Sequence, residues 1–177
     1  MNQFTVGAAI VALLAPGLGP TTSAAERSSE AARKGPPWIS IEHPVNPHDA
    51  TTRDAFLVVH AYHHGTPTAF PVRGTAEGFV NGQRRTVSLE FGRTSRPGAY
   101  SLKKQWRDEG VWTLVISVVQ GEGDAAQALV DLAADGTVAA VKVPSRKSSD
   151  GWTIPAPRSL ASIEADLRTR AAVVRTN

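Results

Sequence analysis

All five histidines of this 177-residue chain lie between residues 43 and 64. Imidazole is a common ligand of Zn(II) and Cu(II), so histidines this close in sequence are candidates for a divalent metal site. On a straight strand His60 and His64 lie about 13 Å apart, at about 3.3 Å per residue, and cannot share one ion. A site therefore requires the end of one strand to meet the preceding strand and its loop, where Asp49 adds an oxygen ligand. The candidate ligands are His43, His48, His63 and His64.

The same residues also have a purely structural interpretation, in which His60 is a half-buried strand residue and His63-His64-Gly65 is a solvated turn. The chain has no cysteine, which excludes disulfides, thiolate nucleophiles and sulfur-ligated metal sites. It also lacks the G-x-S-x-G, H-E-x-x-H and phosphate-binding glycine motifs. The sequence therefore predicts a protein that is not an enzyme. Were it one, a pocket lined by His60, Tyr62 and His64 would be the first place to look.

Basic residues dominate the segment from residue 84 to residue 107, in which Glu90 is the only acid. They are Arg84, Arg85, Arg93, Arg96, Lys103, Lys104 and Arg107. Gathered on one surface, they would suit anionic lipid headgroups, phosphate-bearing polymers or an acidic protein partner. Charges that solvate strand ends and protect sheet edges are the alternative interpretation. A net charge of only +3 and an aromatic content of 6% argue against nucleic acid as the partner.

The elements that must position these residues read as short strands. Runs rich in valine, isoleucine, leucine and aromatic residues alternate with Gly, Pro, Asn and Asp every eight to twelve residues, which is typical of a β-sandwich. The predicted strands are Trp38–Glu42, Ala55–His63, Gly74–Val80, Arg85–Phe91, Ala99–Lys104, Val111–Gln120, Ala126–Ala133 and Thr137–Val143. Asn81-Gly82 and Asp135-Gly136 are tight-turn pairs between strands.

The run from Val111 to Gln120 is apolar on both alternating faces, so we predict that it is a central strand. On this pattern Trp112 belongs to the core, whereas Trp106 and Trp152 lie in polar contexts and are expected at the surface. Exposed tryptophans raise the possibility of carbohydrate stacking, but no Asp or Asn pattern for sugar hydroxyls accompanies them. After Pro157, apolar residues recur at three- and four-residue steps, which predicts an amphipathic helix capped by Ser159.

The first 25 residues carry no charged side chain and contain an apolar run of about ten residues, too short to span a bilayer. We predict a signal peptide cleaved near Ala24 or Ala25, or alternatively an uncleaved N-terminal anchor, and hence a periplasmic or secreted protein. The predicted organisation is a signal peptide at 1–25, a flexible leader at 26–37, the β-sandwich at 38–144, a linker at 145–158 and the helix at 159–177. No transmembrane span is expected in the mature chain.

The segment from Gly98 to Val118 resembles the end of YtkA-like domains, which are small extracytoplasmic immunoglobulin-like sandwiches. The shared pattern is Gly-x-Tyr, a spacer, then Gly-x-Trp before alternating apolar residues, here Gly98, Tyr100, Gly110 and Trp112. The resemblance implies an immunoglobulin-like sandwich of seven to eight strands and a binding or accessory role, in some cases near copper handling. The N-terminal histidine ligand of related copper carriers has no counterpart in this chain, which would begin at Ala25 or Glu26.

Together these observations predict a non-catalytic exported binding or accessory module of the cell envelope, with a protein or other envelope component as its partner. The alternative is a periplasmic protein that binds Cu(II) or Zn(II) through its histidines.

Overall fold

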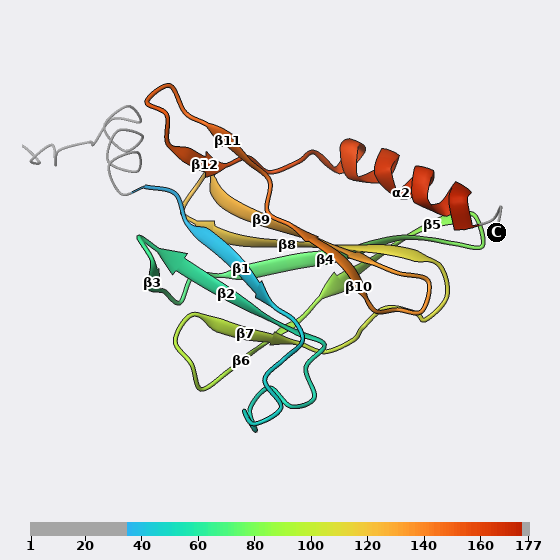
Figure 1. Ribbon diagram of the computed structural model, residues 1–177, viewed down its shortest axis with the longest axis horizontal. Helices are drawn as coiled ribbons and strands as arrows, with labels where there is room; N and C mark the ends of the chain where they lie inside the picture. The colour runs from blue at the N-terminus through green and yellow to red at the C-terminus, as the bar shows by residue number, and fades with distance from the viewer. Residues whose placement is uncertain (1–34, 175–177) are drawn as a thin grey trace, which may run out of the picture. The chain divides into compact units, whose positions relative to one another are not determined.

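The computed structural model describes residues 35–174, a mostly β unit with one C-terminal helix (Figure 1). The predicted signal peptide and most of the predicted leader lie outside these residues. Two antiparallel sheets pack together, which confirms the sandwich-like arrangement predicted from the strand spacing. No helix within residues 35–174 is long and apolar enough to cross a membrane.

Sheet A has the strand order β1-β2-β7-β6, with β3 paired to the end of β2. Its strands are β1 (Trp38–Glu42), β2 (Leu57–His63), β3 (Thr66–Pro67), β6 (Phe91–Arg93) and β7 (Ala99–Leu102). Sheet B has the order β10-β9-β8-β4-β5. Its strands are β4 (Val72–Val80), β5 (Gln83–Leu89), β8 (Val111–Gln120), β9 (Asp124–Leu132) and β10 (Val138–Lys142). A separate hairpin of β11 (Ser145–Lys147) and β12 (Thr153–Pro155) precedes helix α2 (Leu160–Val174).

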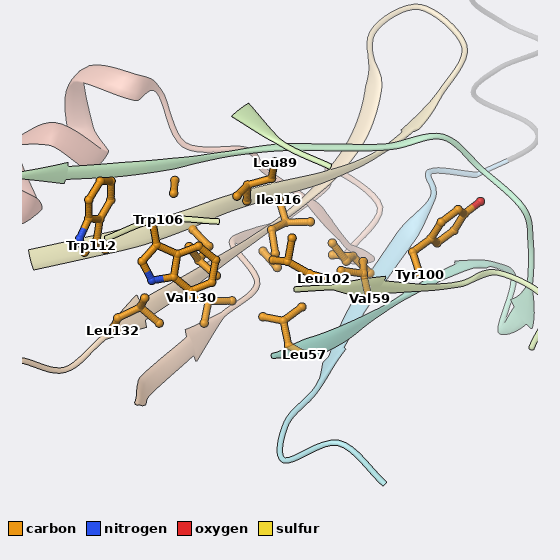
Figure 2. Packing of buried hydrophobic residues seen from close by; sticks show 14 of the residues in the cluster. Leu57, Val59, Leu89, Tyr100, Leu102, Trp106, Trp112, Ile116, Val130 and Leu132 are labelled. Atoms are coloured by element: carbon orange, nitrogen blue, oxygen red, sulfur yellow. The ribbon is translucent and has the colours of Figure 1, made fainter. Parts of the chain in front are cut away.

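The core between the sheets is built on β8, the middle strand of sheet B. As predicted, Trp112, Leu114, Ile116 and Val118 all point into this core, where each is at most 3% exposed. Figure 2 shows Trp112 and Ile116 packed with residues of both sheets, among them Leu57 of β2. The indole of Trp112 lies over Gly78, its cross-strand partner on β4, and occupies the space that a side chain at residue 78 would need.

The turn between β4 and β5 has the predicted chemistry, since Asn81 and Gly82 both have positive φ angles, of 51° and 76°. The predicted strand Arg85–Phe91 is wrong as a single element, because the chain leaves sheet B after Leu89 and enters sheet A at Phe91. Glu90 makes the crossing. The side chain of Gln105 accepts a hydrogen bond from the Glu90 N–H (2.9 Å) and donates one to its carbonyl (2.8 Å), replacing the lost sheet pairing.

Trp106 is buried rather than exposed, which corrects the expectation drawn from its polar neighbours. It is 6% exposed and meets Phe56 edge to face, with ring centroids 5.0 Å apart. The loop between β7 and β8 turns this side chain inward into the core, while Arg107 and Asp108 remain exposed. Trp152, by contrast, is 74% exposed as expected.

Helix α2 covers the outer face of sheet B, opposite the core. Ser159 caps it as predicted, because its carbonyl accepts from Ile163 (3.1 Å) and its hydroxyl from the Ser162 N–H (3.3 Å). Ile163, Leu167 and Ala171 pack against Val111 and Leu129. The apolar stripe of the helix therefore packs on sheet B, and β8 is buried on both faces.

Candidate functional site

The most connected group of ionisable side chains on sheet A centres on Glu42. Its carboxylate accepts hydrogen bonds from His60 Nε2 at 2.8 Å, Arg96 Nη1 at 2.9 Å and the Asn46 N–H at 3.2 Å. Arg96 Nε lies 3.3 Å from a carboxylate oxygen of Asp49. One network thus joins Glu42, His60, Arg96 and Asp49. It links edge strand β1, the neighbouring strand β2, the loop after β1 and the turn between β6 and β7.

Strand alternation puts these groups on the outer face of sheet A. Ile39 is buried and Ile41 packs against the core, so the intervening Ser40 and the flanking Trp38 and Glu42 point away from it. On β2, Val59 and Ala61 point inward and His60 and Tyr62 outward. Register then pairs Trp38 with Tyr62 and Ser40 with His60. We call Trp38, Glu42, Asp49, His60, Tyr62 and Arg96 the outer-face site.

The two carboxylates of this site are held in their charged forms. Burial of Glu42 raises its pKa, but hydrogen bonds from Arg96 and His60 outweigh that effect and hold the pKa below its ordinary value. Hydrogen bonds from the side chain and backbone of Thr51 lower the pKa of Asp49. At neutral pH the guanidinium of Arg96 therefore lies between two anionic carboxylates, and the network fixes the loop that follows β1.

Two aromatic side chains continue the site along the strands. Trp38 is 37% exposed, and Tyr62 is half-buried with its ring stacked near that of His60, at 6.2 Å between centroids and an interplanar angle of 23°. Rigid aromatic surface beside paired charges is suited to binding, because little conformational entropy is lost when a partner covers it.

The structure separates the predicted histidine ligands into two groups. His43 follows β1, and its Nδ1 donates a hydrogen bond to the Phe56 carbonyl at 3.1 Å, with His48 in the same exposed loop. His63 and His64 lie together at the other end of β2, with ring centroids 4.3 Å apart. The length of β1, about 13 Å, lies between the two groups. Within residues 35–174 no three His, Asp or Glu side chains are arranged to hold a metal ion. Metal binding through His43, His48, His63 and His64 stays a prediction.

The predicted basic residues are likewise divided. Arg84 and Arg85 lie on β5 in sheet B, whereas Arg93 lies on β6 in sheet A and Arg96 in the turn after it. Four of the seven make ion pairs: Arg84 with Glu77 and Glu164, Arg96 with Glu42 and Asp49, Lys103 with Asp54, and Lys104 with Asp108. Whether the remaining cations contribute to a binding surface stays a prediction.

A second polar network lies under helix α2. Asp131 of β9 accepts from Thr113 Oγ1 at 2.7 Å and Lys142 Nζ at 2.8 Å, and its carboxylate lies 3.1 Å from Arg170 Nη2. Burial raises the pKa of Asp131, but the bonds from Lys142 and Thr113 and the charge of Arg170 outweigh it and lower the pKa overall. In register, Glu77, Thr113 and Asp131 form one polar row across β4, β8 and β9. This network attaches the helix to the sheet.

The comparisons with known proteins add no relative. The chain matches no family model, no curated protein and no solved structure. The outer-face site therefore has to be interpreted from its own geometry.

Sequence reasoning named His60, Asp49 and Arg96 but missed Glu42, which connects them. Glu42 and Arg96 are 54 residues apart in the sequence, and no local sequence pattern predicts their contact. The available signal was strand alternation: Glu42 and His60 fall on the outward positions of neighbouring strands.

Proposed function

We propose that this chain is a non-catalytic exported binding or accessory module of the cell envelope, built on an immunoglobulin-like sandwich. The observation that carries the proposal is the outer-face site. Its charged groups pair with one another and so fix this part of the surface. Beside them lie two aromatic rings, that of Trp38, which is exposed, and that of Tyr62, which is half-buried. Such a surface favours recognition of a partner over turnover.

The immunoglobulin-like assignment draws support from the Gly-x-Tyr and Gly-x-Trp positions. Tyr100 and Trp112 are both in the core, where Tyr100 also donates its hydroxyl hydrogen to the Phe70 carbonyl at 2.7 Å. Gly98 and Gly110 have φ angles of 65° and 98°, and a side chain at either would come within 2.7 Å and 2.5 Å of neighbouring backbone atoms. These positions require glycine, because its lack of a side chain permits both the positive φ angle and the close backbone contact.

Site-specific photo-crosslinking in intact cells tests the proposal. A photoreactive amino acid at position 38 should give a discrete adduct in the envelope fraction, and the same group at Val141, which is 43% exposed on edge strand β10, should not. Loss of the adduct in Tyr62→Ala protein with an unchanged circular dichroism spectrum would support the outer-face site. Turnover of a defined substrate that is abolished by His60→Ala would overturn the proposal, as would finding the full chain outside the envelope fraction.

A further inference from the structure

The hairpin of β11 and β12 holds the most exposed large apolar side chain of the described residues. Trp152 is 74% exposed, and within residues 35–174 its indole makes no hydrogen bond or ring contact. The tip that carries it is nevertheless well defined. The Ser148 N–H donates to the Trp152 carbonyl at 2.8 Å, the Gly151 N–H to the Ser148 carbonyl at 3.0 Å, and the Trp152 N–H to the Ser148 hydroxyl at 3.1 Å. The backbone that carries this largely exposed indole is therefore fixed by the hydrogen bonds of the turn.

The charges of this hairpin are mostly positive. Arg146 and Lys147 are both exposed and form no ion pair with any residue of the described part of the chain. Register places Arg146 opposite Ile154, on the same face of the hairpin as Trp152, because side chains alternate along each strand. Asp150, at the tip, is the single carboxylate in the hairpin and accepts a hydrogen bond from the Ser149 hydroxyl at 3.2 Å.

The hairpin lies at the end of the sandwich where the described chain begins (Figure 1). At that end β1 begins with Trp38, which pairs with Tyr62. The ring of His63, on β2, lies against that of Phe70. The next residue, Pro71, accepts a hydrogen bond from the Val119 N–H at 3.0 Å. The β8–β9 turn follows directly. The first described residue, Gly35, therefore lies at the end of the sandwich that carries Trp152.

We propose that the Trp152 hairpin is a membrane-surface contact that inserts its indole at the headgroup level of a bilayer rich in anionic lipid. Tryptophan prefers this level because its ring is apolar and its N–H can still be hydrated. Arg146 and Lys147 add attraction to anionic headgroups. A narrow projecting tip fits a deformable lipid surface better than a protein partner, for which a standard interface covers about 800 Å² on each side. The inference rests on the proposed envelope location.

Binding of the full chain to vesicles tests this inference. The vesicles contain equal amounts of phosphatidylglycerol and phosphatidylcholine, or phosphatidylcholine alone. We expect Trp152→Ala to weaken partitioning to the anionic vesicles about tenfold. Arg146→Gln with Lys147→Gln should weaken it about 25-fold, from about fivefold per charge. Asp150→Asn should strengthen it severalfold. Val173→Ala, at an exposed apolar position on α2, and Arg53→Gln, at an exposed cation in the loop between β1 and β2, are the matched controls and should have no effect.

A second readout is specific to the hairpin and independent of any binding by residues 1–34. Brominated phosphatidylglycerol quenches an indole that enters the bilayer, so wild-type fluorescence should fall and the quenched component should be absent from Trp152→Phe protein. Equal quenching of the two proteins, or weakening by the controls as large as that by Trp152→Ala, would overturn the inference. The inference would also be overturned if a photo-crosslinker at position 152 captured a protein and the full chain did not bind the vesicles. The adduct at position 38 reports the proposed function separately.

Discussion

Replacing Asp131 with alanine removes the acceptor shared by three side chains under helix α2. Lys142 is 56% exposed and returns to water, so its pair contributes less than about 1 kcal/mol. Thr113 is 3% exposed and the side chain of Arg170 29%, and leaving these donors without the carboxylate costs about 1–3 kcal/mol. We therefore expect Asp131→Ala to lower the free energy of unfolding by about 1–4 kcal/mol.

Guanidinium denaturation followed by circular dichroism measures this loss, with Lys142→Ala as the matched control. The control should cost less than about 1 kcal/mol because it removes the exposed partner and leaves the buried bonds in place. The low pKa of Asp131 fixes the sign of the pH dependence. Its stabilisation is present above the ordinary carboxyl pKa of about 4 and is lost as the pH falls below it. An Asp131→Ala variant no less stable than Lys142→Ala, with an unchanged acid transition, would refute the reasoning.

Two further changes test the core and the outer-face site. Gly78→Ala would place a methyl group within 2.4 Å of the Trp112 ring, and we expect a loss of about 1–3 kcal/mol in thermal or chemical unfolding together with a changed tryptophan emission. Unaltered stability would mean that the ring has room to move. Glu42→Gln should flatten the loss of stability between about pH 5 and pH 3, because the lowered pKa of Glu42 makes its stabilisation disappear as the carboxylate is protonated. An acid unfolding curve that superimposes on wild type would contradict this assignment.

Local sequence patterns were sufficient to predict the elements whose structure depends mainly on residues close to them in the sequence. The two apolar faces of β8 predicted a central strand, and Asn81-Gly82 predicted a tight turn, because each depends on side-chain alternation or backbone freedom within a few residues. The helix from Leu160 was predictable for the same reason, since its apolar residues recur with helical spacing and Ser159 caps it.

Features that depend on distant partners were not predictable in this way. Trp106 has polar neighbours in sequence, and only the fold brings Phe56 against it. The break between β5 and β6 is decided by Gln105, which lies 15 residues beyond Glu90. The segment 145–158, expected as a linker, contains the β11–β12 hairpin, whose register depends on a turn at Ser148 rather than on apolar alternation.

The position of helix α2 at the end of the chain also affects biosynthesis. Sheet B can pair all its strands once residue 142 has been made, but Val111 and Leu129 stay uncovered until α2 follows. A nascent or truncated polypeptide that stops before residue 160 therefore exposes an apolar surface of sheet B, interrupted by the carboxylates of Glu77 and Asp131. Quality-control proteases and holdase chaperones recognise exposed apolar surfaces of that kind. Docking of the fifteen-residue helix α2 therefore determines when they no longer bind the newly made chain.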